Sequence, residues 1–192
     1  MPFDRMNDVS DDALLVLYAN GDPEAAKMLT QRLTPRIYAH AYRMLSNQAD
    51  AEDVAQEAML RLWRIAPDWR QGEAKVTTWL YRVVANLCTD RLRRARTKPL
   101  DAVAEPADGA ASVAQQMQTR ARIDALHGAL ATLPDRQREA VVLRHIEGLA
   151  NPEIAEIMQI SIEATESLTA RGKRALATAL KARKDALGFT DD

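Results

Sequence analysis

The sequence predicts an all-α protein. Its long runs are built from Ala, Leu, Arg, Glu and Gln, which favour helices, and its 192 residues include only 7 Gly and 8 Pro. Hydrophobic residues make up 47% of the chain and aromatic residues only 5%, so aliphatic side chains and alanine have to fill the cores. A chain of this length forms one large domain or two small ones.

Capping residues mark the first two helices. Ser10 precedes a short apolar stretch and is expected to cap a helix over Asp11–Asn20. Asp22-Pro23 provides an N-cap followed by proline at the first helical position, so a second helix begins there. Apolar residues continue at helical spacing to Leu45, although Thr34-Pro35 is expected to kink or restart this helix.

Two further helices are expected before residue 98. The third opens at Asp50, whose side chain can cap nearby amides, and it ends at Pro67. The stretch from 68 to 75 carries Gly72 and is predicted to be a loop. A long fourth helix then runs from about Val76 to Arg96 with an aliphatic core side.

The stretch after the fourth helix differs in composition. From Pro99 to Ser112 it contains two prolines, a glycine and three acids, and no basic residue lies between Lys98 and Arg120. Such a composition is typical of flexible linkers. We therefore predict two small helical domains, over residues 1–98 and 120–192, joined by an acidic linker over 99–119.

The second domain is predicted to end in a helix-turn-helix. Helices are expected over Ala121–Ala131 and from Pro134 to Glu147, the latter stopped by Gly148. A short helix from Asn151 to Met158 follows, then a tight turn, and then a longer helix. This order of a short helix, a turn and a basic helix favours binding to duplex DNA.

The helix-turn-helix prediction identifies an inner and an outer face. Ile154, Ala155 and Met158 are expected to pack inward. The residues expected at the DNA are the cap Ser161 and the outward side chains Glu163, Glu166, Ser167, Arg171, Lys173 and Arg174. An ordinary helical hairpin with a solvated basic face gives the same pattern, so the motif alone leaves both interpretations open.

Charge is distributed unevenly along a nearly neutral chain. The formal net charge is −1, which alone does not indicate a nucleic-acid binder. Six basic residues nevertheless fall between Arg82 and Lys98, against one acid, and six more between Thr165 and Lys184. Two basic helices indicate two separate contacts with a polyanion.

The sequence contains no catalytic or metal-binding pattern. The three histidines, His40, His127 and His145, lack metal-ligand spacing and are expected to be surface or half-buried structural residues. The single Cys88 excludes an internal disulfide, fits the reducing cytoplasm and is expected to be a buried apolar thiol. No apolar stretch approaches the length of a membrane span, so we expect a cytoplasmic protein. Because catalytic and metal-binding patterns are missing, we expect no cofactor and no enzymatic activity.

Two segments of the first domain have an ordinary interpretation. Acids between Asp50 and Glu57 favour the positive end of a helix dipole and are otherwise solvated. The fourth helix can be a core helix with a solvent-exposed basic face, and Asn86 and Asp90 lie on that face near Arg82 and Arg93. On these patterns alone, neither segment has an assigned role.

Four segments in order resemble the extracytoplasmic-function (ECF) branch of bacterial sigma factors, in the sigma-70 family. DAEDVAQEAMLRLW (Asp50–Trp63) is similar to the polymerase-clamp-binding helix, and TTWLYRVVANLCTDRLRR (Thr77–Arg94) to the helix that melts and reads the minus-ten element. LPDRQREAVVLRHIEGLANPEIAEIMQIS (Leu133–Ser161) resembles the start of the second domain. EATESLTARGKRAL (Glu163–Leu176) stands in the place of the minus-thirty-five recognition helix.

The resemblance implies roles for individual residues. The residues expected to face the beta-prime clamp are Asp50, Glu52, Asp53, Gln56 and Glu57. Those expected at the minus-ten element are Trp69, Arg82, Asn86, Asp90, Arg91, Arg93 and Arg94. Among these, Trp69 and Asn86 would hold a flipped base by stacking and edge hydrogen bonds, and the arginines would neutralise phosphates.

The resemblance also implies partners. They are core RNA polymerase, through its beta-prime clamp and beta flap, promoter DNA and an anti-sigma factor that holds the protein inactive. The acidic linker would enter the RNA path of the polymerase. The sequence departs from the family at two positions. An apolar residue is usual where Thr165 stands, and a basic residue is frequent where Glu166 stands.

Two other classes of protein remain to be weighed against a sigma factor. A stand-alone helix-turn-helix regulator would bind duplex operators as a dimer, without polymerase. It leaves Asp50–Trp63 and the fourth helix without a task. A helical interaction protein with no DNA role would show no salt-dependent binding to promoter DNA.

Overall fold

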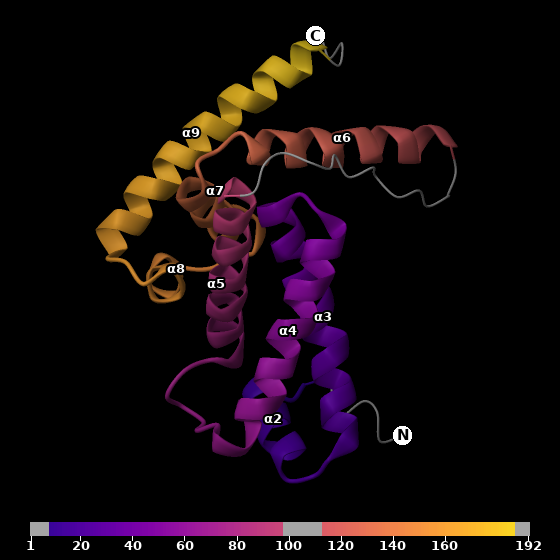
Figure 1. Cartoon of the computed structure of the whole chain (residues 1–192), viewed down its shortest axis with the longest axis vertical. Coiled ribbons are helices and arrows are strands. Elements are labelled where there is room, and N and C mark those ends of the chain that lie inside the picture. The colour runs from indigo at the N-terminus through magenta and orange to yellow at the C-terminus, as the bar shows by residue number, and fades with distance from the viewer. Residues whose placement is uncertain (1–7, 98–112, 187–192) are drawn as a thin grey trace.

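The computed structural model describes residues 8–97 and 113–186, and all regular structure in these ranges is helical (Figure 1). The elements of the first half (residues 8–97) are α2 Asp11–Ala19, α3 Pro23–Leu45, α4 Gln48–Ile65, the short 3₁₀ turn η1 Ala66–Asp68 and α5 Val76–Thr97. Those of the second half (residues 113–186) are α6 Val113–Ala131, α7 Asp135–Val141, the π turn η2 Val142–Ile146, α8 Asn151–Met158 and α9 Ile162–Ala186. The all-α prediction is confirmed.

The first two helices begin at the predicted caps. The Ser10 Oγ accepts a hydrogen bond from the Ala13 amide at 3.2 Å. The Asp22 Oδ1 accepts from the amides of Glu24 and Ala25 at 2.9 and 3.3 Å, and Pro23 is the first helical residue. Both side chains satisfy amides that lack a partner in the first turn of a helix.

The cap predicted for α4 is wrong, and the restart of the second helix expected at Thr34-Pro35 does not occur. The cap of α4 is Asn47 rather than Asp50, because the Asn47 Oδ1 accepts from the Asp50 amide at 2.9 Å and asparagine caps as well as aspartate does. Helix α3 continues through Pro35 without a restart. Leu33 and Ile37, which flank the proline, are 2% and 1% exposed, and this packing holds the helix together despite its missing hydrogen bond.

A single apolar core holds the first half together. It is formed by residues from each of its four helices; among the largest fully buried members are Leu14, Leu29, Leu62 and Leu80. Figure 1 shows α3, α4 and α5 running alongside one another, with α2 across their lower end. The bundle positions α4, which carries the predicted polymerase residues, and α5, which carries the predicted minus-ten residues other than Trp69.

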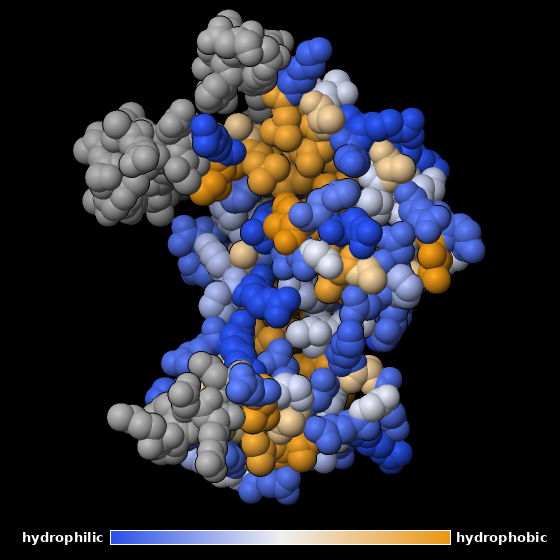
Figure 2. Space-filling model, turned by 180° about the vertical axis from the view of Figure 1, so that it is seen from behind, coloured by the Kyte–Doolittle hydropathy of each residue, from blue (hydrophilic) through white to orange (hydrophobic). Residues whose placement is uncertain are grey.

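The second half packs α7 and α6 against α9. Leu130, Leu133, Val141 and Val142 are buried in this contact. Gly172 marks the closest approach, because a Cβ atom there would lie 2.5 Å from Val141 Cγ2 and 2.8 Å from the Gln137 carbonyl oxygen. On the rear face, Figure 2 shows an apolar area at the upper end, at the level of α6 and α9 in Figure 1.

Helix boundaries in the second half differ from the prediction. Helix α6 begins at Val113, so residues 113–119, expected in the linker, are helical; the Ala, Gln and Met residues in this stretch favour helix. The rest of the predicted linker, 99–112, lies outside the described residues. The helix predicted to end at Glu147 does stop before Gly148, which has φ +75°, but it ends in the π turn η2.

The two halves pack directly against each other. Helix α5 lies against α8, and α3 touches both α6 and α7. Tyr81 and Ala85 of α5 are buried in a cluster with Ile154, Ile157 and Met158 of α8. The face of α5 that carries these residues is therefore occupied by the second half.

Candidate nucleic-acid interface

The predicted helix-turn-helix is present. Helix α8 ends at Gln159, whose φ of 53° reverses the chain, and the Ser161 Oγ accepts from the Ala164 amide at 3.1 Å to begin α9. Ile154, Ala155 and Met158 are buried at 0%, 7% and 5%, as predicted. Ser161 thus acts as a cap, which keeps its hydroxyl at the end of α9.

The outer face of α9 is accessible. Glu163, Arg171, Lys173 and Arg174 are exposed. Hydrogen bonds from its own backbone amide and from the Ser161 hydroxyl hold the pKa of Glu163 below its usual value, so it is charged at neutral pH. This face offers carboxylate acceptors near the N-terminus and cationic donors further along, the pairing that suits base edges and phosphates.

Neighbouring polar residues order the middle of this face. The Arg171 Nη2 donates to the Ser167 Oγ at 2.6 Å, and the Asn151 Nδ2 donates to the Glu166 Oε1 at 3.3 Å. The unusual Thr165 is fully buried and donates its hydroxyl to the Ser161 carbonyl at 3.1 Å. A satisfied hydroxyl explains how a polar residue occupies a position where the family usually has an apolar one.

The predicted minus-ten residues follow the length of α5. Asn86, Arg93 and Arg94 are exposed. The Arg93 Nη2 donates to the Asp90 Oδ1 at 3.0 Å. Arg82 lies near the start of the helix and pairs instead with Glu156 of α8, at 3.1 Å.

Trp69 lies beside the start of α5, in the loop after η1. Its ring is half-buried and meets Trp79 edge to face, with centroids 6.2 Å apart at 81°. Its Nε1 is buried and makes no hydrogen bond to the described residues. The ring is thus held by packing, and its orientation does not depend on a polar partner.

Arg91 connects the two predicted sets in the first half. Its guanidinium lies 2.6 Å from the Asp50 Oδ1 and 3.6 Å from the Asp53 Oδ2. A residue predicted to contact phosphate is therefore paired with two residues predicted to contact polymerase. The pairing fixes α5 against the start of α4.

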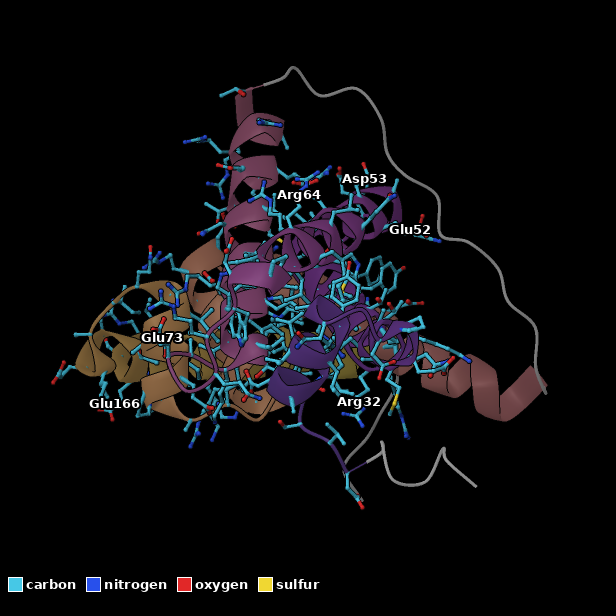
Figure 3. All side chains as sticks on the ribbon, turned by 90° about the horizontal axis from the view of Figure 1, so that it is seen from below. Arg32, Glu52, Asp53, Arg64, Glu73 and Glu166 are labelled. Atoms are coloured by element: carbon cyan, nitrogen blue, oxygen red, sulfur yellow. The ribbon has the colours of Figure 1, made fainter. Side chains whose placement is uncertain are left out.

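The acidic face of α4 is open to solvent. Glu52, Asp53 and Gln56 are exposed, and Figure 3 shows Glu52 and Asp53 projecting from α4 on the side away from Glu166 of α9. Glu57 accepts from the Arg61 Nε at 2.8 Å, and this hydrogen bond lowers the pKa of Glu57.

An apolar groove runs beside this face, and sequence reasoning missed it. The groove has a volume of about 540 Å³ and is lined by Tyr38, Met59, Leu60 and Trp63, among others. Leu60 is 42% exposed and adds an aliphatic side chain to the groove. The apolar residues Ala55, Met59 and Trp63, spaced four residues apart along α4, were the available signal.

Cys88 and His40 are both buried in the first half. Within 8–97 and 113–186, no cluster of His, Cys, Asp and Glu is arranged to hold a metal ion. Cys88 is fully buried as predicted, and burial raises the pKa of its thiol to about 12. The prediction for His40 is wrong: it is completely buried rather than at the surface or half-buried. No described helix is both long and apolar enough to cross a membrane.

A polar cluster between the two halves also escaped prediction. Glu147, at the end of η2, accepts from the Tyr81 hydroxyl at 2.6 Å and from the Arg43 Nη1 at 3.0 Å, and the His40 Nδ1 lies 3.8 Å away. Burial opposes the charge, but His40, Tyr81 and Arg43 together hold the pKa of Glu147 below its usual value. We call these four residues the Glu147 cluster.

Both halves match known families. Residues 29–98 match Sigma-70 region 2, and residues 123–176 match Sigma-70, region 4. The chain is 32% identical over 174 residues to the ECF RNA polymerase sigma factor SigW of Bacillus subtilis, covering 84% of this chain and 91% of SigW. It is 34% identical over 181 residues to the ECF RNA polymerase sigma factor SigM of Mycobacterium tuberculosis, covering 93% of this chain and 88% of SigM.

Solved structures share the fold. CnrH, in a complex with the cytosolic domain of CnrY, superposes with a TM-score of 0.67 at 25% identity, covering 90% of this chain and 97% of CnrH. The sigma factor RpoE, solved with the anti-sigma factor NepR from Bartonella quintana, gives a TM-score of 0.64 at 23% identity, covering 81% of this chain and 96% of RpoE.

Proposed function

The chain belongs to the ECF sigma factors of the sigma-70 family, and we propose that its two halves use the surfaces described above to engage core RNA polymerase and promoter DNA. It is a transcription initiation factor: it supplies promoter recognition to the polymerase and performs no catalysis of its own. The observation that carries this conclusion is the match of both halves, in order, to regions 2 and 4. We assign region 2 to residues 1–98, the linker to 99–119 and region 4 to 120–192.

Helix α9 is proposed to read the minus-thirty-five element. Its N-terminal turns carry Glu163, Glu166 and Ser167, which can reach base edges when the helix lies in the major groove. Arg171, Lys173 and Arg174 then meet phosphates. Glu166 would accept a hydrogen bond from a cytosine amino group, so it favours cytosine at the contacted position of the minus-thirty-five element.

Helix α5 and the preceding loop are proposed to capture the minus-ten strand. Trp69 supplies an aromatic ring for a base that has left the stack, and Asn86 supplies edge hydrogen bonds. Arg93 and Arg94 are exposed near the end of α5, where they can neutralise phosphates.

The exposed acids of α4 are proposed to bind the beta-prime clamp. Glu52, Asp53 and Gln56 point into solvent, and the adjoining apolar groove adds surface that a helical partner can bury. Region 4 would contact the beta flap, and the linker would enter the RNA path. Because core RNA polymerase acts in the cytoplasm, a protein that binds it is proposed to be cytoplasmic.

An anti-sigma factor is proposed as the regulatory partner. The two solved relatives are both described in complexes with partner proteins, and one of these partners is an anti-sigma factor. Such a partner inactivates this chain if it covers the α4 face or keeps the two DNA-binding helices apart from the promoter.

The stand-alone regulator is the less favoured interpretation. It explains α8 and α9 but gives no role to residues 29–98, which match region 2. A regulator of that kind would need no acidic clamp surface on α4.

Binding to core polymerase tests the proposal. We expect the wild-type chain to co-purify with bacterial core polymerase, and the variant Asp53→Lys with Glu57→Lys to lose this binding because both acids face solvent on α4. Glu24→Lys, an exposed acid at the start of α3, serves as the matched control and should bind like the wild type. Failure of the wild-type chain to bind core would refute the assignment.

A further inference from the structure

Apolar side chains join α5 to the helix-turn-helix. Tyr81 and Ala85 are 2% and 5% exposed because they pack on Ile154, Ile157 and Met158 of α8. This contact covers part of the helix proposed to bind the minus-ten strand. Because Tyr81 is buried, the contact between α5 and α8 has an apolar core and is more than a peripheral surface contact.

Three ion pairs flank this apolar contact, from the residue just before α5 to the C-terminal end of that helix. Lys75 Nζ lies 2.7 Å from Glu153 Oε1, Arg82 Nη2 lies 3.1 Å from Glu156 Oε1, and Arg96 Nη2 lies 2.6 Å from Asp135 Oδ2. In every pair the cation comes from the first half and the acid from the second. The acids of α7 and α8 therefore occupy cations that lie beside or within the proposed minus-ten surface.

Buried polar contacts close the upper part of the interface. The carboxylate of Glu147 is 9% exposed and is held by Tyr81 and Arg43 of the first half. Arg138 of α7 is 7% exposed and donates to the Met44 carbonyl at the end of α3, as well as to the Leu130 carbonyl in its own half at 2.8 Å. The buried carboxylate of Glu147 therefore depends on Tyr81 and Arg43 of the first half, whereas Arg138 adds one hydrogen bond across the interface to those it makes within its own half.

The arrangement is incompatible with simultaneous binding of both promoter elements. Elements centred near minus ten and minus thirty-five lie about 25 base pairs apart, or about 85 Å along B-form DNA at ~3.4 Å per base pair. Helix α5 instead touches α8, which a short turn joins to α9. The two proposed DNA helices must separate before both elements can be occupied.

We propose that the second half acts as an internal competitor: in the free chain it binds α5 through the Tyr81 contact, the three ion pairs and the Glu147 cluster, and it must be released before the promoter is bound. This inference rests on the proposed function for the identity of the competing ligand. The acidic face of α4 stays exposed in the closed state, as Figure 3 shows for Glu52 and Asp53, so polymerase can bind first and release can follow.

Zero-length crosslinking with a carbodiimide tests the closed state on the native chain. The reagent activates a carboxylate, and a touching lysine amine displaces the urea to form an amide. We expect an amide between Lys75 and Glu153 in the monomer band of the free protein, found by peptide mass spectrometry. Lys75→Arg keeps the ion pair but cannot form the amide, so it identifies the product. The Lys27–Glu24 pair within α3, at 3.7 Å, serves as an internal control for the reagent.

Two comparisons complete the test. The double variant Tyr81→Phe, Glu147→Gln leaves Lys75 and Glu153 intact and should lose most of the amide if closure depends on the Glu147 cluster. Addition of core polymerase and promoter DNA should also abolish it. Absence of the amide in the free monomer overturns the closed state, whatever the transcription activity of the chain. Undiminished amide in the promoter complex overturns the competition instead.

Discussion

Arg82 of α5 and Glu156 of α8 form an ion pair of 3.1 Å across 74 residues of sequence. The arginine is proposed to meet a phosphate near the minus-ten element, and in the closed chain a carboxylate takes that place. Both side chains are partly exposed, at 31% and 50%, so this single pair is weak and readily exchanged for DNA. Closure therefore depends on the buried contacts around it.

Glu147→Gln should open the chain. The substitution keeps the shape of the side chain but removes the charge that Arg43 and Tyr81 contact, at a cost of about 1.5–3 kcal/mol for a charge-assisted hydrogen bond. Spin labels can be attached at Arg64→Cys and Ala177→Cys in a Cys88→Ala background, and we call this labelled chain the parent. Pulsed electron paramagnetic resonance should show a longer and broader distance distribution for the Glu147→Gln variant than for the parent. An unchanged distribution would mean that the cluster does not hold the halves together.

The stability of closure should also depend on pH through Glu147. Its pKa is lowered in the closed state, so its contribution is present above its ordinary value of 4.5 and is lost as the pH falls through the lowered value. The same spin-label distances should lengthen on acidification in the parent. The Glu147→Gln variant should show a smaller change over this range.

Arg171→Ala and Arg174→Ala should weaken holoenzyme binding to the promoter at all sequences alike. Each removes a proposed phosphate contact, so the slope of log affinity against log salt should fall by about one per residue. Fluorescence anisotropy over a salt series measures this slope. Lys27→Ala, on α3, is the control and should leave it unchanged; equal slopes for all three variants would exclude α9 from the DNA.

Trp69→Ala should impair promoter melting, whereas Trp69→Phe should retain part of it. Stacking of a base on an aromatic ring is worth about 1–3 kcal/mol, and the Trp69 Nε1 makes no hydrogen bond to the described residues that phenylalanine would lose. Permanganate reactivity of unpaired thymines in the holoenzyme–promoter complex reports melting. Full reactivity with Trp69→Ala would remove this residue from the minus-ten site.

Gly172→Ala should destabilise the second half, contrary to the helix propensity of alanine. In an open helix the exchange would add about 1 kcal/mol of stability. Here the new methyl group meets the Gln137 carbonyl oxygen at 2.8 Å, and such overpacking costs about 1–3 kcal/mol. Urea unfolding of the full chain should show a lower midpoint than the wild type, with Ala170→Ser on the same helix as the control. A higher midpoint would show that α7 and α9 can move apart freely.

Local signals predicted most of the fold. Ser10, Asp22 and Ser161 lie at helix starts where their side chains cap amides, and these signals depend on only a few neighbouring residues. The start of α4 shows how precise such signals are. Asn47 and Asp50 are both good capping residues and lie three positions apart, and the prediction took Asp50 where the structure uses Asn47. The outward face of α9 was predictable for the same reason, since helical periodicity places it opposite Leu168 of the same helix, which packs against Ile154 and Met158 of α8.

Contacts between distant segments could not be predicted. Glu147 was recognised only as the last residue before Gly148, yet it meets Tyr81 at 2.6 Å across 66 residues. Arg138 gave no signal of burial in the sequence, because a charged residue becomes buried only when carbonyls from elsewhere converge on it. The packing of the two halves follows from such convergence, and a composition typical of a flexible linker gave no indication of it.

Run-off transcription tests the central claim most directly. Purified bacterial core polymerase would be combined with this chain and a library of upstream DNA from its own genome. We expect discrete starts that appear only with the chain and disappear with the Asp53→Lys, Glu57→Lys variant, while the Glu24→Lys control keeps them. No chain-dependent starts, from a preparation whose helical content and cooperative unfolding show that it is folded, would contradict the assignment as a promoter-directing sigma factor.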